Sequence, residues 1–525
     1  MAHNKITPTS LKHRLENVSL STLIWFCVIA AALLAVTVID AQNGWITDDS
    51  VLYLEVARLF SIGQWEAGFR LYNWPLYPAL IQTVHKITGL GLQASAQCLQ
   101  VLFFAVTSYY FCTLVVLAGG DRLAVASGTL ILLSAPYIVG DVLPMLIRDQ
   151  GFWAFFLAGL TYFIRFFQAG KFHLSLLWQS SMIFAALFRI EGIAFLALIP
   201  LSLLMNSALR IRSRCAQLLC SYSMTLALLL LSVVAVGMQI VSVESMGRLK
   251  DLLDPKVYLE LFEKFDVRAE VMASQVLGGF LDDYALVSLL ITLLLILVVK
   301  TLAATGCATL ALVFLEFRKN FVDITPAVKS VLLWTVGIAL LNAIFVLLKD
   351  FVLSGRYVIT ISFILMAIAA IGMENSIAGL KNTSNRARLE NIVLCGVVLL
   401  LIFNLIHNLM PMRPGYNYEQ EAVAWVKKQT SQKDKVFYVS PRARFYAGAN
   451  FSGRGSDHWQ QVNDAIQAKA IHQYDYLVIN IKDKEQEQEL LMQLPEYQIA
   501  KVFEGVKGRK KMVILTRKSK QVWKG

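Results

Sequence analysis

The sequence predicts a mainly α-helical, multi-pass membrane protein that ends in a small soluble α/β domain. Of its 525 residues, 57% are apolar and only 16% are charged, whereas about a quarter are charged in an ordinary soluble chain. Apolar runs of roughly 18 or more residues recur up to residue 410, and each can cross about 30 Å of hydrocarbon as a helix. From about Arg413 the chain is polar. We therefore predict a transmembrane domain over 1–410 and a soluble domain over 411–525.

The apolar runs give about eleven crossings when the basic connections are held on one side of the membrane. The runs at 172–188 and 193–206 are short, and the run at 284–317 is too long for one simple crossing, so it tilts, protrudes or breaks near Gly306. Two long connections lie outside, a first outer loop at 41–91 and a second at 240–283. The expected spans are about 21–40, 93–118, 122–143, 150–168, 172–188, 193–206, 215–239, 284–317, 330–349, 356–374 and 391–410.

The net charge of +12 does not indicate a nucleic-acid partner, because much of it lies in short connections between the spans. That distribution is typical of cytoplasmic loops. It predicts a cytoplasmic N-terminus and a C-terminal domain on the outer side of the membrane, with the lipid bilayer as the first partner. The basic residues concerned are Lys5, Lys12, Arg14, Arg122, Arg165, Lys171, Arg210, Arg212, Arg214, Arg318, Lys319, Lys329, Lys381, Arg386 and Arg388.

The soluble domain alternates between helical and strand patterns, which predicts a small α/β sandwich. It contains no Gly-rich phosphate-binding loop. A structural lid and a catalytic part are therefore both open interpretations of this domain. The expected helices are 418–430, 460–472 and 484–493, and the expected strands are 435–439, 476–481, 498–503 and 512–516.

Ionisable residues gather in the segments that this topology places on the outer face. Asp48 and Asp49 are adjacent at the start of the first outer loop, where two carboxylates at a membrane surface are costly. Each such residue alone could be an interfacial charge that reaches water, but several clusters on one face indicate a site. The others are Glu55 and Arg58 on a helix expected from Asp49 to about Phe60, Arg148 with Asp149, Arg189 with Glu191, Asp282 with Asp283, and Arg356 with Tyr357.

These residue types suit group transfer from a phosphate-linked donor. A carboxylate can take the proton of an acceptor hydroxyl or hold a divalent cation. Arginine pairs with phosphate oxygens in bidentate fashion and stabilises charge that develops on a leaving phosphate. The seven histidines are scattered, so no zinc-type spacing competes with this interpretation.

The order of short motifs resembles the GT-C superfamily of polytopic glycosyltransferases, specifically the protein O-mannosyltransferase and aminoarabinose-transferase branch, which is glycosyltransferase family 39-like. The resemblance covers the chain to about residue 375. The chain has two aspartates where many relatives have Asp-Glu, and Arg148 where many have threonine. The motifs are Asp48-Asp49 with Tyr53, Pro75-Leu76-Tyr77-Pro78, Arg148-Asp149 with Trp153, Phe188-Arg189 with Glu191-Gly192, and Arg356-Tyr357.

The resemblance implies a protein of the bacterial inner membrane, with its C-terminal domain in the periplasm. It also implies transfer of a hexosyl or pentosyl group from a polyprenyl-phosphate-linked donor, on the periplasmic side, to a lipid, glycan or protein acceptor. It implies that Asp48, Asp49 and Asp149 are catalytic, with Asp48 as the essential acid. Whether Asp48 and Asp49 hold a divalent cation, Mg or Mn, is left open. It also implies donor-phosphate binding by Arg148, Arg189, Arg356 and Tyr357, and substrate binding by Tyr53, Glu55, Arg58 and Glu191.

Two other functions remain open. An O-antigen polymerase or ligase is also polytopic with large outer loops, but it relies mainly on loop arginines, so neutral substitution of the Asp48–Asp49 pair should be tolerated. A secondary transporter would place ionisable groups in broken helices near the middle of the bilayer and show internal repeats. We find no convincing repeat in the sequence.

Overall fold

The computed structural model describes residues 18–239, 254–317, 324–381, 385–411, 417–431, 433–451, 453, 458–508 and 510–519. Several predicted features lie outside the described residues, namely the basic residues Lys5, Lys12, Arg14, Arg318 and Lys319, the side chains of Lys381, Arg386 and Arg388, and the first part of the second outer loop, 240–253.

The chain divides into two compact units, neither continuous in sequence. The helical unit consists of residues up to Val38, Cys98–Leu143 and Arg148–Leu409. The mixed unit consists of Ile39–Gln97, Pro144–Ile147 and the residues from Met410 onward. Its described parts thus include the first outer loop, which the sequence predicts as part of the transmembrane domain. The predicted domain boundaries stay a prediction.

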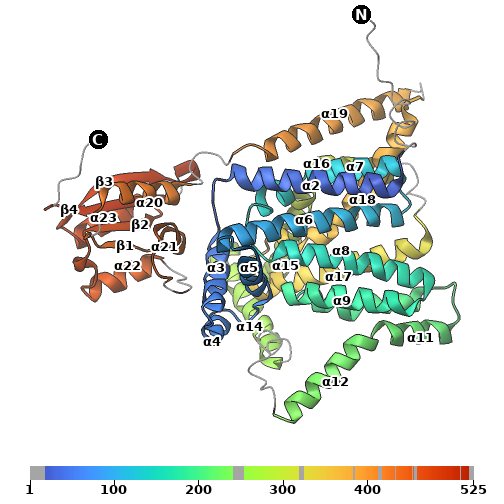
Figure 1. Ribbon diagram of the computed structural model, residues 1–525, viewed down its shortest axis with the longest axis horizontal. Coiled ribbons are helices and arrows are strands. Elements are labelled where there is room, and N and C mark those ends of the chain that lie inside the picture. Colours follow the sequence, from blue (N-terminus) through green and yellow to red (C-terminus); the bar gives the residue numbers. More distant parts are fainter. Residues whose placement is uncertain are drawn as a thin grey trace, which may run out of the picture. The chain divides into compact units, whose positions relative to one another are not determined.

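In the helical unit, the long apolar helices α2, α6, α8 and α9 run in nearly the same direction, whereas α12 and α14 run obliquely to them (Figure 1). The described helices of this unit are α2 Leu20–Ala41, α6 Leu92–Leu117, α7 Arg122–Leu133, η1 Pro136–Val142, α8 Asp149–Ala169, α9 Phe172–Phe188, α10 Gly192–Leu198, η2 Ile199–Met205, α11 Ile211–Ser221, α12 Ser223–Gly237, α14 Pro255–Val271, η4 Met272–Leu277, η5 Asp282–Tyr284, α15 Ala285–Thr305, α16 Cys307–Phe317, α17 Pro326–Asp350, η6 Gly355–Tyr357, α18 Ile359–Ala378, η7 Gly379–Lys381 and α19 Asn385–Asn408.

The predicted multi-pass membrane character is confirmed by the helices. Among the described residues, seven helices are long and apolar enough to cross a bilayer, and nine are if each of two bent pairs counts as one span. The helices Phe172–Phe188 and Gly192–Met205, expected to be short, are too short to be counted with them. The expected total of about eleven is therefore not established by helix length and composition.

Three of the expected spans are interrupted. The long apolar run at 284–317 breaks at Gly306, one of the three alternatives that its length left open, because Gly306 has φ of 85° and ends α15. A positive φ of this size favours glycine, which has no Cβ. The pair α7 and η1 is bent by 42°, and the pair α11 and α12 by 49°.

Helix α18 lies at the centre of the helical unit. Most of its residues are buried, and it packs against α7, α15, α16 and α17. The aromatic rings of Trp153 on α8 and Phe363 on α18 meet edge to face, with 5.9 Å between their centroids. This packing fixes the start of α18, and with it the short helix η6 that carries Arg356.

The first outer loop folds into three helices, α3 Asp48–Ser61, α4 Trp65–Leu71 and α5 Leu76–Thr88. The helix predicted from Asp49 is present, whereas α4 was not predicted. Thr47 and Ser50 form a reciprocal capping box at the start of α3, which satisfies backbone groups that would otherwise lack partners. Asp48 and Asp49 therefore occupy the first turn of α3, where the helix dipole favours negative charge.

The C-terminal residues form a four-stranded sheet in the order β1-β2-β4-β3, with β1 Val436–Tyr438, β2 Tyr476–Ile481, β4 Lys511–Arg517 and β3 Tyr497–Glu504. Strands β1 and β2 are parallel and the other pairs antiparallel. The helices are α20 Tyr418–Gln429, α21 Pro441–Ala447, α22 His458–Gln467 and α23 Lys484–Gln493, with the short helices η8 Ile471–Gln473 and η9 Val506–Gly508. All the predicted elements are present, and α21 is an addition.

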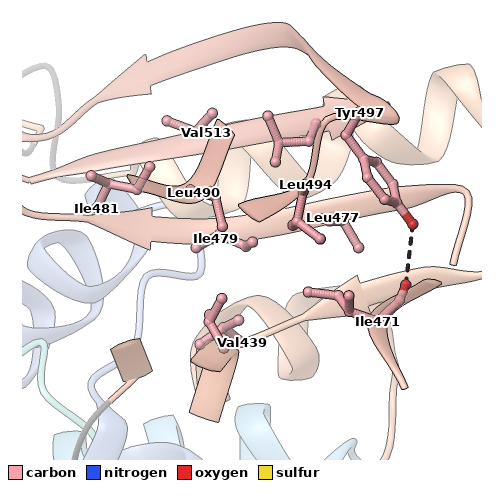
Figure 2. Packing of buried hydrophobic residues seen from close by; sticks show 11 residues of the cluster. Val439, Ile471, Leu477, Ile479, Ile481, Leu490, Leu494, Tyr497 and Val513 are labelled. Atoms are coloured by element: carbon pink, nitrogen blue, oxygen red, sulfur yellow. Dashed lines mark hydrogen bonds between the residues drawn. The ribbon is translucent and has the colours of Figure 1, made fainter. Parts of the chain in front are cut away.

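Side chains alternate along β2, so the sheet is covered on both faces. Leu477, Ile479 and Ile481 belong to one apolar cluster (Figure 2), which also takes in Val462 of α22 and Leu490 of α23. Tyr476 and Val478 belong to the opposite cluster, with residues of α20 and α21. The prediction of an α/β sandwich is correct.

Within the mixed unit, the first outer loop is hydrogen-bonded to the C-terminal residues. The Ile46 amide donates to the Tyr446 hydroxyl at 3.1 Å. The Gln420 side chain donates to the Asn43 carbonyl at 3.1 Å. These contacts, together with packing of α21 against α3, place Asp48 beside residues of the α/β fold.

Candidate functional site

Four predicted site residues of the helical unit meet in one cluster, although they come from three separate segments. Asp149 is the first residue of α8, Arg189 and Glu191 lie between α9 and α10, and Arg356 lies in η6. Each therefore sits at the end of an apolar helix, where backbone groups without helical partners are also found.

Arg189 is the centre of this cluster. Its side chain is only 5% exposed, and it pairs with both Asp149 and Glu191. The contact with Glu191 uses two nitrogens, at 3.0 and 3.3 Å, and such bidentate pairing fixes the guanidinium plane. Arg189 also donates to Asp149 Oδ1. A buried arginine is thus held between two carboxylates.

The aromatic side chains around Arg189 complete its enclosure. The Arg189 guanidinium carbon lies 4.4 Å from the centroid of the Tyr357 ring and 5.8 Å from that of Phe152, within the range of cation–π attraction. The residues around this cluster leave a cavity of only about 10 Å³, about the smallest space that can hold one water molecule. In this arrangement Arg189 is closed to a ligand.

Arg356 is the more accessible arginine of the cluster. Its side chain is 27% exposed, and its Nη1 lies 3.6 Å from Asp149 Oδ2. Arg148 is partly exposed next to Asp149, and its charge acts on Glu191. Three arginines against two carboxylates leave the cluster one net positive charge. The exposed arginines are therefore the ones that an anion can reach.

Glu191 remains ionised in this environment. Burial opposes its ionisation, but the charge and hydrogen bonds of Arg189 outweigh burial and lower the pKa of Glu191 from 4.5 to about 2. The Glu191 carbonyl also accepts a hydrogen bond from Asn342 of α17 at 3.2 Å. Glu191 therefore acts as a permanent negative charge that anchors Arg189.

The predicted site residues of the mixed unit all lie on α3. The Asp48 side chain is 60% exposed, and its Oδ1 lies 3.1 Å from Nε of Arg442 in α21. A cavity of about 290 Å³ opens beside Asp48, lined also by Trp459, Lys482 and Lys510. Asp49 follows in the same helical turn. Asp48 is thus both paired and open to solvent.

Tyr53 is a packing residue of the first outer loop. It is 5% exposed, and its ring meets Tyr72 and Tyr77 edge to face at 5.3 and 5.4 Å. The tyrosines of the Asp48–Tyr53 and Pro75–Pro78 motifs therefore hold α3 against α5. Direct substrate binding by Tyr53 stays a prediction.

Glu55 and Arg58 form a bidentate ion pair on α3, with both N–O distances 2.8 Å. The hydrogen bonds that Arg58 donates to the Glu55 carboxylate raise the pKa of Arg58 above its ordinary value. The pair lines a groove of about 590 Å³ between α3 and α21, together with Arg444 and Phe445. A groove of this size with both polar and apolar walls can hold a sugar or a lipid headgroup.

Two functional candidates could not be recognised from the sequence. Arg442 is one, because nothing in the local sequence indicates that it pairs with Asp48. Gln150 is the other, since it is fully buried next to Asp149, and its amide nitrogen and oxygen have no hydrogen-bond partner among the described residues. An unsatisfied buried amide costs about 1–3 kcal/mol.

The described residues do not form a recognisable metal site. No group of three or more His, Cys, Asp and Glu side chains comes close enough together within that part of the chain. Mg²⁺ is commonly held by one or two carboxylates, with waters and substrate phosphates as its other oxygen ligands, so metal binding by Asp48 and Asp49 stays a prediction.

Comparison with known proteins does not extend this description. No protein-family model matches the chain, and no curated protein matches it significantly. The two groups of site residues lie in different units, so their convergence on one site stays a prediction.

Proposed function

We propose that the protein is a membrane glycosyltransferase of the GT-C type. It transfers a sugar from a polyprenyl-phosphate-linked donor to a lipid, glycan or protein acceptor on the periplasmic face. The observation that carries the proposal is the buried cluster of Asp149, Arg189, Glu191 and Arg356 in a multi-pass membrane protein. Buried ion pairs seldom stabilise more than apolar packing would, so such a cluster favours a functional explanation.

In the proposed reaction, the acceptor hydroxyl oxygen forms a bond to the anomeric carbon of the sugar. The bond between that carbon and the phosphate oxygen breaks, and polyprenyl phosphate leaves. Asp48 takes the hydroxyl proton as general base. Arg356 pairs with the leaving phosphate as its charge increases, while Arg189 orients Asp149 and stays enclosed. The groove beside Glu55 and Arg58 would receive a part of the acceptor remote from the reacting hydroxyl, because Asp48 lines a separate cavity and not this groove.

The proposal includes eleven crossings with the N-terminus in the cytoplasm. The short helix α9 and the pair α10 and η2 would join the nine longer candidates. Arg189 and Glu191 lie in the connection between α9 and α10. This topology would place the first outer loop and the α/β fold in the periplasm, which cysteine labelling of loops from either side of the membrane would test.

The function can be tested with purified protein in lipid nanodiscs. Supplied with a polyprenyl-phosphate sugar and an envelope extract, wild-type protein should release polyprenyl phosphate. Asp48→Asn should reduce this release by about 100-fold or more, the range expected for loss of a general base. Glu66→Gln, which removes a carboxylate that is 79% exposed on α4, is the matched control. Transfer by Asp48→Asn at the wild-type rate would contradict the mechanism. Mass spectrometry of envelope lipids and glycoproteins would identify the sugar.

A secondary transporter is the second candidate, and the two bent helix pairs favour it. Discontinuous helices form the substrate sites of many transporters. Proteoliposomes separate the two functions, because a transporter would move the donor or sugar across the membrane without releasing polyprenyl phosphate.

A further inference from the structure

Asp48 forms an ion pair with a residue of the α/β fold, Arg442. Arg442 lies in the first turn of α21, and its Nε is 3.1 Å from Asp48 Oδ1. The geometry is that of an ion pair without an aligned hydrogen bond, because Nε has no hydrogen-bond acceptor among the described residues. The carboxylate is thus attracted to Arg442 but can still turn toward another group.

Arg442 is itself held in place by Glu419. Its Nη2 donates to Glu419 Oε1 at 2.5 Å, and the Glu419 side chain is 3% exposed. Glu419 also accepts hydrogen bonds from Tyr418 at 3.0 Å and from Ser440 at 2.5 Å. Three donors on one buried carboxylate give it a single orientation, so the position of Arg442 is fixed by the α/β fold.

Arg442 keeps its charge in this position. Burial favours its neutral form, but the charges of Glu419 and Asp48 outweigh burial and raise the pKa of Arg442. The groups that face Asp48 come from several elements, namely Asp49 on α3, Tyr418 and Glu419 on α20, Arg442 and Tyr446 on α21, and His458, Lys482 and Lys510 around the cavity.

We infer that Arg442 is a positioning residue, through which the C-terminal fold holds the Asp48 carboxylate toward the adjacent cavity. This inference rests on the proposed function, because it assigns Asp48 the role of base. The C-terminal fold then takes part in the reaction and is not only a structural lid. The exposed side of Asp48 is left for the acceptor hydroxyl.

The test compares Arg442→Gln and Arg442→Lys in full-length protein, with Arg70→Gln as control. Arg70 is an arginine of the same unit that is 78% exposed and paired with Glu66. Arg442→Gln should lower kcat by about tenfold or more with little change in KM for the donor. Arg442→Lys should restore kcat in part, and Arg70→Gln should change neither kcat nor KM.

Two results would overturn the inference. The first is transfer by Arg442→Gln at the wild-type kcat, which would leave the proposed function intact. The second comes from thermal unfolding of Asp48→Asn, Arg442→Gln and the double variant. Coupled residues give melting-temperature shifts that do not add, whereas additive shifts would contradict the contact. If wild-type protein transfers no sugar, the proposed function fails, and this unfolding cycle alone decides whether Arg442 holds Asp48.

Discussion

Gly151 of α8 lies against the ring of Phe188, the last residue of α9. A Cβ added to Gly151 would be 2.3 Å from the nearest ring carbon, far inside van der Waals contact. Gly151 is two residues after Asp149, and Phe188 directly precedes Arg189. This close approach therefore sets the distance at which Arg189 meets Asp149, so the glycine of the Arg148–Trp153 motif has a packing role.

Gly151→Ala should weaken the site by forcing Phe188 away from α8. The buried ring, in edge-to-face contact with Phe103, has little room to move, so we expect a loss of about 1–3 kcal/mol in unfolding free energy and loss of transfer. Thermal unfolding and the release assay measure the two effects. Gly396→Ala is the control, because Gly396 is helical and its added methyl meets no atom within 4 Å. If Gly151→Ala and Gly396→Ala have the same stability and the same rate of polyprenyl phosphate release, Gly151 does not have this packing role.

Arg189→Met should destabilise the protein by about 3–5 kcal/mol, because it leaves the carboxylates of Asp149 and Glu191 buried without their main partner. Combining it with Asp149→Leu and Glu191→Met removes those charges, so stability should return in large part while transfer should not. Unfolding midpoints and polyprenyl phosphate release would be measured in parallel. If the triple variant transfers sugar, the cluster is structural only.

The stability of the protein should fall in acid partly through Glu191. Its pKa is about 2 in the folded protein, compared with 4.5 ordinarily. The unfolded chain therefore binds a proton below pH 4.5 that the folded protein does not, and the stabilising contribution is complete above pH 4.5 and lost as the pH falls toward 2. In Glu191→Gln, the melting temperature should therefore change less with pH between 4.5 and 2 than in the wild type. If the melting temperature of Glu191→Gln depends on pH as strongly as that of the wild type, Glu191 does not contribute.

Gly91→Trp should block the groove beside Glu55 and Arg58. Gly91 lines this groove, and an added Cβ meets no atom within 4 Å. The indole should therefore enter the groove without disturbing the fold, raise KM for the acceptor and leave donor binding unchanged. Gly91→Ala, which adds only a methyl group, is the size control. Unchanged acceptor kinetics in Gly91→Trp would rule out the groove as the acceptor site.

Local sequence patterns predicted most of the secondary structure. The long apolar runs predicted the membrane helices, and the short, nearly continuous apolar run Tyr476–Ile481 predicted β2, because the length and spacing of apolar residues in a short segment indicate which of its faces are buried. The short helices α4 and α21 were missed. Each has seven residues, and at that length tertiary packing outweighs the weak local preference.

The motif residues were found from the sequence, but their contacts were not. Asp149, Arg189 and Arg356 were selected as charges expected on one face, and their partners in the cluster became visible only when the helix ends were placed in space. The pairing of Asp48 with Arg442 had no sequence signal, because an arginine in a soluble domain is ordinarily a solvated surface residue.

The sequence by itself determined that this is a multi-pass helical protein with a terminal α/β fold, since hydrophobic length and periodicity are properties of short segments. Only the tertiary structure decided that Arg189 is enclosed between two carboxylates, that Arg356 is the exposed arginine, and that Arg442 holds Asp48. Those outcomes depend on contacts between residues far apart in the chain, and such contacts are set by how helices and strands pack together.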